Sequence, residues 1–238
     1  MISIIVPTYN EKENIIDFLD KTNTQLDLAG IKAEIIVVDD NSPDGTADLI
    51  EDYKKLHNNV VLARREKKKG LSSACVYGFN LSNSEILGVM DSDLSHAPQA
   101  LPYLINPLLY NLCDITIGSR YISGGRILNW PIRRYIVSRT AGFLGSTLTT
   151  VKDVTSGFFF FKRKVIEGVA IDPIGFKICL EILIKGNYQT AIEVPYTFSD
   201  RATGKSKMGI KEILLYLQHL RRLYRYKANP HKDLRNRI

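Results

Sequence analysis

The chain has 238 residues, of which 45% are hydrophobic and 24% charged, a composition typical of a folded globular protein with a sizeable core. No run approaches the roughly 18 consecutive apolar residues of a membrane-spanning helix, and the first residues lack the basic start of a secretory signal. We therefore expect a protein that stays in the cytoplasm or faces it. Three cysteines in apolar contexts, Cys75, Cys113 and Cys179, indicate reduced core residues rather than a disulfide framework or a zinc site.

The net charge of +7 is concentrated at the end of the chain. Residues 221–238 contain seven basic side chains and one acidic side chain, so this segment carries +6 and the rest of the chain only +1. A charge confined to one end argues for contact between the tail and an anionic surface. This distribution of charge shows no element suited to reading a nucleic-acid groove, so we expect no nucleic-acid partner.

Strands and helices alternate through the first half of the chain. We predict strands over 2–6, 33–38, 60–62 and 85–90, and helices over 11–28, 46–56 and 71–81. The first strand is expected to stop at Pro7. This alternation predicts an α/β fold with a doubly wound, mainly parallel sheet and helices on both faces. Ligands of such sheets bind beyond the carboxyl ends of the strands, where Pro7, Asp39 and Asp91 fall.

The second half is less regular. We predict strands over 115–118, 157–161 and 192–195, helices over 133–150 and 208–226, and a loop over 200–209. The last helix has an apolar stripe beside its basic residues. Because no linker or internal repeat is visible, we expect one catalytic domain over 1–207, followed by a basic amphipathic helix and tail over 208–238.

Two carboxylates one residue apart, Asp91 and Asp93, follow the apolar strand over 85–90. Such a pair needs a counter-charge, and a hard divalent cation such as magnesium or manganese suits it when phosphates supply further ligands. The structural alternative is a solvated turn, which Asp also favours. His96 is more simply a hydrogen-bonded loop residue than a metal ligand.

Polar residues at two other strand ends suit a nucleotide. Asp39 is placed to accept hydrogen bonds from a ribose or a base edge, whereas Asp44 and Thr46 can be explained as a turn and helix cap. After the first strand, Tyr9 could stack on a nucleobase and Glu11 could meet its edge. A turn initiated by Pro7 is the structural alternative.

Cations occur in the loops that follow the other strands. They are found in the basic run 65–69, which includes Lys68, at Arg120 after a strand, and at Arg134, one helical turn before Ser138. Arg201 and Lys205 lie in a later loop, which we expect to close over a bound anion. A charge run is often only solvated, but the planar fork of arginine suits phosphate oxygens. Taken together, these residues predict a base-binding turn, a ribose-binding acid, a metal-binding acid pair and phosphate-binding cations at one sheet edge.

The ordered motifs resemble the glycosyltransferase family 2 enzymes of the GT-A fold, and more narrowly the dolichyl-phosphate mannose synthases. The resemblance spans nearly the whole chain. It is carried by residues 7–11, 39–46, 90–96, 118–121, 153–158, 175–177 with Glu181, 193–195, 200–201 and 204–207. In one departure from the family pattern, Ser72 stands after Leu71 where a glycine is usual, which makes the basic loop stiffer.

The resemblance implies transfer of mannose from GDP-mannose to dolichyl or another polyprenyl phosphate, with inversion at the anomeric carbon and Mg²⁺ or Mn²⁺ as cofactor. It assigns the residues as follows: guanosine to Pro7, Tyr9, Glu11 and Asp39; metal and diphosphate to Asp91 and Asp93, with Ser95 as an adjoining ligand; acceptor phosphate to Arg120, Arg134 and Ser138; and closure over the donor to Arg201 and Lys205. Lys68 is expected to help neutralise the donor. The acceptor is already ionised, so the catalytic residues Asp91, Asp93, Arg120 and Arg134 would position groups and neutralise charge rather than remove a proton.

The resemblance also bears on membrane contact. Many relatives continue into transmembrane helices or rely on a membrane-anchoring subunit, whereas this sequence offers a basic amphipathic helix suited to the cytoplasmic face of an anionic membrane. The alternative is a helix that packs on the domain and leaves a solvated end.

Two other functions stay open, and a third is disfavoured. The donor could be UDP-glucose or UDP-N-acetylglucosamine with the same kind of acceptor. The chain could also be a non-catalytic nucleotide-sugar-binding module, although both acids and both arginines are present. A nicotinamide-dependent dehydrogenase is disfavoured because no Gly-x-Gly-x-x-Gly follows the first strand.

Overall fold

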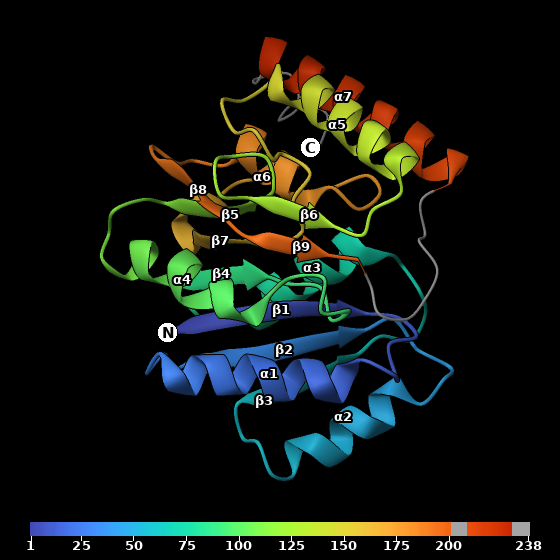
Figure 1. Ribbon diagram of the computed structural model, residues 1–238, viewed down its shortest axis with the longest axis vertical. Coiled ribbons are helices and arrows are strands. Elements are labelled where there is room, and N and C mark those ends of the chain that lie inside the picture. Colours follow the sequence, from blue (N-terminus) through green and yellow to red (C-terminus); the bar gives the residue numbers. More distant parts are fainter. Residues whose placement is uncertain (201–208, 230–238) are drawn as a thin grey trace.

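The computed structural model describes residues 1–200 and 209–229, which form a central sheet covered by helices on both faces (Figure 1). The sheet has seven strands in the spatial order β3-β2-β1-β4-β7-β5-β8. The strands are β1 (Ile2–Thr8), β2 (Glu34–Asp39), β3 (Val60–Arg64), β4 (Ile86–Val89), β5 (Ile115–Ser119), β7 (Phe159–Lys162) and β8 (Ala191–Pro195). A small parallel pair, β6 (Arg126–Leu128) and β9 (Thr197–Ser199), lies outside this sheet.

All the ladders of the large sheet are parallel except those of β7, which is antiparallel to both β4 and β5. The prediction of a mainly parallel sheet is therefore confirmed. The reversal has a consequence for function. The parallel strands end at one edge of the sheet, and β7 begins at that edge. The loop before β7 therefore lies beside the loops that follow the parallel strands.

Seven α-helices complete the described residues. They are α1 (Ile15–Leu28), α2 (Thr46–Lys54), α3 (Leu71–Leu81), α4 (Leu101–Leu109), α5 (Ile132–Ser146), α6 (Ile178–Lys185) and α7 (Ile210–Ala228), with 3₁₀ turns η1 (Pro98–Ala100) and η2 (Arg163–Val165). Helices α1, α2 and α4 share one apolar cluster with the sheet, and α3, α6 and α7 share the other. None of the described helices combines the length and apolar composition needed to cross a bilayer.

The aromatic strand β7 ties the two layers together. Phe158 and Phe160 belong to the cluster on one face, whereas Phe159 and Phe161 belong to the cluster on the other, as the period of two in a strand requires. Gly88 of β4 lies opposite Phe160, and a Cβ there would come within 2.1 Å of the phenyl ring. The glycine therefore makes room for the aromatic side chain.

Several sequence predictions need correction. The first strand does not stop at Pro7 but continues to Thr8, with Pro7 paired to Val38; the ladder with β4 ends at Ile5 and Val89, so among the described residues no strand pairs with Pro7 on that side. The first helix begins at Ile15, not at 11, because the chain first makes a tight turn in which the carbonyl of Glu11 accepts the Ile15 N–H at 2.9 Å. The helix predicted to reach residue 150 ends at Ser146.

Four elements were absent from the sequence prediction. They are α4, α6 and the three-residue strands β6 and β9. Helix α4 contains two prolines, which mask its helical pattern, and α6 is apolar on nearly all sides. The three cysteines are buried and reduced, as predicted.

The C-terminal helix α7 packs on the domain through its inner face. Tyr216, Leu220 and Leu223 join the apolar cluster beneath it, and the Tyr216 hydroxyl donates to the Ala141 carbonyl of α5 at 2.6 Å. Figure 1 shows α5 and α7 lying together at one end of the molecule. Glu181 of α6 holds α7 in the interior through His219 at 3.1 Å and Arg222 at 3.4 Å.

Candidate functional site at the carboxyl edge of the sheet

The loop after β1 and the turn after β2 form the part of the site predicted to hold a nucleotide. Asp39 is fully buried, and its two oxygens accept the Ser42 N–H at 2.8 Å and the hydroxyls of Ser42 and Thr8. In the structure these hydrogen bonds shape the turn after β2. The predicted contact of Asp39 with guanosine stays a prediction. Glu11 lies close by, since its backbone N–H donates to the Thr46 hydroxyl of α2.

The basic loop is held against the same turn. The guanidinium of Arg65 forms a buried ion pair with Asp40, whose other oxygen accepts the Gly70 N–H at 2.8 Å. This anchoring leaves Lys68 free to reach across, and its ammonium lies 3.6 Å from the centre of the Tyr9 ring. The structure thus brings together two residues predicted to contact the donor, one as a cation and one as a stacking surface.

The acid pair follows β4, as predicted. Asp93 is buried, and one of its oxygens accepts both the N–H and the hydroxyl of Ser95, the latter at 2.6 Å. The carboxylate of Asp91 is 26% exposed and faces the ring of His96. His96 itself is buried, stacks on Phe158 and accepts the Asp91 N–H at 3.1 Å, so it orders the turn as expected of a loop histidine.

A second cluster surrounds Arg120, which follows β5. Asp153 is fully buried and binds this guanidinium through both oxygens at 2.7 Å, while also accepting the Arg120 backbone N–H. Arg120 also donates to the Thr155 hydroxyl at 3.0 Å. The carboxylate holds the pKa of Arg120 above its ordinary value, and the guanidinium holds the pKa of Asp153 below its own, although burial alone would shift both the other way.

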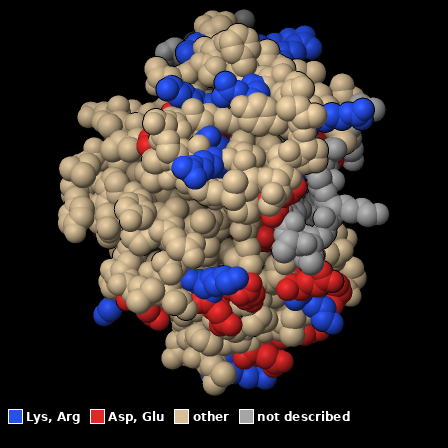
Figure 2. Space-filling model, in the orientation of Figure 1, with Lys and Arg blue, Asp and Glu red and all other residues tan. Residues whose placement is uncertain are grey.

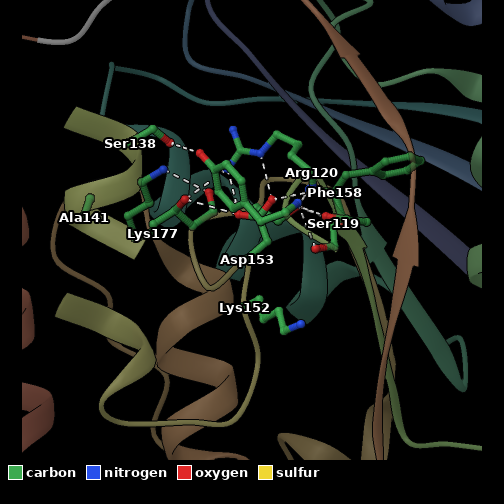
Figure 3. A network of polar contacts seen from close by, with 12 residues as sticks. Ser119, Arg120, Ser138, Ala141, Lys152, Asp153, Phe158 and Lys177 are labelled. Carbon is green, nitrogen blue, oxygen red and sulfur yellow. Dashed lines mark hydrogen bonds and ion pairs between the residues drawn. The ribbon is translucent and has the colours of Figure 1, made fainter. Parts of the chain in front are cut away.

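The loop before β7 joins this cluster to the acid pair, and Figure 3 shows Asp153 of this loop in one network with Arg120. Its first part carries Asp153 and Thr155, which bind Arg120. Two residues later, a Cβ placed on Gly157 would lie only 3.2 Å from the Asp91 carboxylate. One short segment therefore touches both a predicted metal ligand and the partner of a predicted acceptor ligand.

Helix α5 supplies the remaining predicted acceptor residues. The hydroxyls of Ser138 and Tyr121 lie 2.8 Å apart, which ties α5 to the loop after β5. Arg134 forms an ion pair with Asp200 and stacks on Trp130, with its guanidinium 4.4 Å from the ring centre. A cavity of about 460 Å³ opens beside this group and is lined in part by Arg120, Tyr121 and Trp130.

The structure therefore brings most of the predicted residues to one edge of the sheet. Arg201 and Lys205 lie outside the described residues, so their expected closure over the donor stays a prediction. Asp153, Thr155 and Lys177 had no predicted role, although all three stand in motifs that carry the family resemblance. The signal that could have marked Asp153 is a lone acid beside a polar Thr-Ser-Gly run just before an aromatic strand.

Comparison with known proteins shows the family of the chain. Residues 3–169 match the family profile for glycosyl transferase family 2. The chain therefore belongs to glycosyl transferase family 2, which confirms the family expected from the motifs.

Two curated relatives show which members are similar to this chain. It is 44% identical over 231 residues to the dolichol-phosphate mannosyltransferase of Pyrococcus furiosus, covering 95% of this chain and 64% of the relative. It is 39% identical to the dolichol-phosphate mannosyltransferase of Saccharomyces cerevisiae, covering 94% of this chain and 87% of the relative. The chain thus spans a little under two thirds of the archaeal relative.

Solved structures confirm the GT-A-like fold. A mannosyltransferase from Pyrobaculum calidifontis, in complex with GDP-Man and Mn²⁺, superposes with a TM-score of 0.64 at 22% identity, covering 95% of this chain and 64% of that one. Glucosyl-3-phosphoglycerate synthase from Mycobacterium tuberculosis, with Mn²⁺, UDP and phosphoglyceric acid, superposes with a TM-score of 0.67 at 18% identity, covering 96% and 78%.

Proposed function

We propose that this chain transfers mannose from GDP-mannose to a polyprenyl phosphate such as dolichyl phosphate, with inversion and with a divalent cation. The observation that carries the proposal is the loop before β7, which places the Arg120 cluster next to Asp91. A transfer between two phosphate-bearing substrates needs that arrangement, with one charged site for each phosphate. The similarity to dolichol-phosphate mannosyltransferases supports this choice of donor and acceptor.

The chemistry of the acid pair fits a hard cation such as Mg²⁺ or Mn²⁺. Asp91, Asp93 and Ser95 offer only oxygen ligands, and the Asp91 carboxylate is accessible. Within residues 1–200 and 209–229 no three acidic, His or Cys side chains are grouped so that they could hold a metal ion, so donor phosphates would have to supply further ligands. When bound, the cation would neutralise charge on the departing diphosphate.

The chain's own residues position the two substrates. Tyr9, Glu11, Asp39 and Lys68 would hold the nucleoside and its phosphates, and Arg120, Arg134 and Ser138 would orient the acceptor phosphate. Because a phosphate monoester is already ionised at neutral pH, the site requires no strong general base. Its contribution is orientation and the neutralisation of phosphate charge, and the two hydrogen bonds from Arg120 to Asp153 hold the guanidinium in position for this.

We further propose that α5 and α7 contact the cytoplasmic face of a membrane. Their outer surfaces expose apolar side chains together with arginines; these are Ile132, Ile136 and Phe143 with Arg133 and Arg139 on α5, and Leu214 and Leu217 with Arg221 and Arg225 on α7. In Figure 2 the part of the surface over these helices carries Lys and Arg with few acidic atoms. Helix α5 also presents Ser138 inward, so a lipid phosphate could reach the site from this surface.

The catalytic proposal is tested by incubating the full chain with GDP-mannose, dolichyl phosphate and Mn²⁺ or Mg²⁺, and by detecting mannosyl-lipid. The same assay is run with UDP-glucose and UDP-N-acetylglucosamine, and product from these donors alone would establish the alternative donor. A folded protein that binds nucleotide sugars but forms no product would be a binding module. Asp93→Asn is expected to lower turnover at least about a hundredfold if the acid pair acts as proposed.

Membrane contact is tested by sedimentation with vesicles of phosphatidylcholine alone or with 30% phosphatidylglycerol, a composition chosen to compare neutral and anionic surfaces. We expect binding to the anionic vesicles, and weaker binding after Phe143→Ser. Tyr103→Ser is a matched control, since Tyr103 is also exposed but belongs to α4. Equal binding by both variants and the unchanged chain would refute the assignment of this surface.

A further inference from the structure

Lys177 stands beside the Arg120 cluster and has not been given a role. It is the residue immediately before α6, and its ammonium donates to the backbone carbonyl of Thr155 at 2.9 Å. The hydroxyl of the same threonine accepts from Arg120 at 3.0 Å. Thr155 therefore contacts both cations, and Figure 3 shows Arg120 and Lys177 in the same network.

The counter-charge in this cluster is insufficient for both cations. Asp153 is the carboxylate that binds Arg120, and it accepts three hydrogen bonds from that residue. Among the described residues, Lys177 has no carboxylate within ion-pair distance and the one hydrogen bond to Thr155. Burial and the nearby charge of Arg120 lower the pKa of Lys177 to about 8, a value at which the ammonium is still mostly protonated at pH 7.

The position of Lys177 on its helix adds to this excess of positive charge. A cation at the amino end of a helix faces the positive pole of the helix dipole, which is the unfavourable end for it. Two cations and a helix amino end thus meet around Asp153, and the other carboxylate that acts on Lys177 is Asp91, the predicted metal ligand. Such an arrangement is stabilised when an anion enters it.

Arg120 alone is poorly suited to supply the whole contact with a phosphate. Its Nε and Nη2 are engaged by Asp153 and Thr155, so within the described structure Nη1 is the nitrogen left to meet a ligand. The ammonium of Lys177 has three donors, of which one is engaged. It can therefore offer the hydrogen bonds that the arginine cannot.

We infer that Lys177 binds the phosphate of the acceptor together with Arg120. The inference rests on the proposed function, because it assumes a phosphate monoester acceptor. The ligand chemistry is that of a prenyl phosphate dianion, held between the guanidinium and the ammonium. The structural alternative is that Lys177 only fastens the loop before β7 to α6 through the Thr155 carbonyl.

The test uses Trp130, the one tryptophan of the chain, as a local probe. Its ring lies 5.4 Å from the Arg120 guanidinium, so the protein's intrinsic fluorescence reports on this site. The full chain is titrated with geranyl phosphate, a water-soluble prenyl phosphate, and with GDP as a measure of the donor site. Lys177→Gln keeps a donor for the Thr155 carbonyl without the charge, Lys177→Arg keeps the charge, and Lys152→Gln removes a neighbouring lysine that points away from the network in Figure 3.

We expect Lys177→Gln to weaken geranyl phosphate binding about ten- to a hundredfold, the usual effect of losing a charged hydrogen bond. Lys177→Arg should stay within about threefold of the unchanged chain because it keeps the charge, and Lys152→Gln within about twofold because Lys152 lies outside the network. GDP affinities should stay within about twofold in every variant, because GDP reports on the donor site. If Lys177→Gln fails to fold, judged by circular dichroism, Lys177→Met carries the same comparison.

Three results would overturn the inference. They are unchanged geranyl phosphate affinity in the uncharged variant, an arginine variant as weak as the glutamine variant, and a loss confined to GDP, which would place Lys177 at the donor phosphates. The proposed function fails separately, when the unchanged chain forms no mannosyl-lipid. If that product forms while Lys177→Gln retains the KM for dolichyl phosphate, only the role of Lys177 is wrong.

Discussion

The buried carboxylate of Glu181 offers a quantitative test of how α7 is fixed to the domain. Its side chain is fully buried and contacts Lys185 at 2.6 Å, His219 at 3.1 Å and Arg222 at 3.4 Å. Burial alone would raise the pKa of Glu181, but hydrogen bonds from His219 and Lys185 lower it to about 2 from an ordinary value of 4.5. The folded protein therefore stabilises the ionised carboxylate of Glu181 relative to the unfolded chain.

The free energy follows from the size of this shift. A difference of 2.5 pKa units, from 4.5 to about 2, corresponds to about 3 kcal/mol of stability at neutral pH. Because the folded pKa lies below the unfolded value, this stability is fully present above about pH 5 and is lost as the pH falls from 4.5 towards 2. Glu181→Gln should remove it, and should lower Tm by about 6–12 °C for a chain of this length.

Urea unfolding of the unchanged chain and of Glu181→Gln, followed by circular dichroism at pH 7, 5 and 3.5, measures the effect. We expect a gap of about 3 kcal/mol at pH 7 that narrows as the pH falls below 4.5. Asp172→Asn is the matched control, because Asp172 meets the same Arg222 from an exposed position, and should cost less than about 1 kcal/mol. A gap below 1 kcal/mol at pH 7, or one that does not change with pH, would refute this account of the network.

Three further predictions concern the site and the core. Gly157→Ala would place a Cβ 3.2 Å from the Asp91 carboxylate, and the resulting displacement should lower kcat/KM roughly tenfold in the mannosyl-transfer assay without loss of helical signal. Arg65→Met leaves Asp40 buried without its partner and should cost about 3 kcal/mol in urea unfolding, of which adding Asp40→Asn should recover a large part. Burial raises the pKa of the Cys75 thiol, so Cys75 should not react with Ellman's reagent at pH 8 until the protein is unfolded.

Sequence patterns were a sound guide where one physical cause dominates. The strands β1, β2 and β4 are apolar, β-branched and buried on both faces, so their position and the polar residues that end them were predicted closely. Helix α3 was predicted with its observed bounds. The acid pair and Arg120 were predicted because each follows such a strand, and parallel strands end at one edge.

The patterns failed where several causes compete. Helix α4 forms although it contains Pro102 and Pro107. Pro102 stands in the first turn, where proline is tolerated, and the apolar face of the helix is buried against the sheet. Helix α6 lacks an amphipathic period, since seven of its eight residues are buried. Tertiary burial decides both helices, and no local pattern records it.

The direction of β7 determines where the proposed acceptor site lies, and the hydrophobic pattern of a strand does not encode its direction. Were β7 parallel to its neighbours, the loop before it would lie at the opposite edge of the sheet, and Asp153 could not meet Arg120. Because β7 runs the other way, this loop arrives between the residues that follow β4 and those that follow β5. Its glycine then permits contact with Asp91, while its acid and threonine fix the cations. The proposed division of the site into a donor half and an acceptor half is therefore a consequence of one reversed strand.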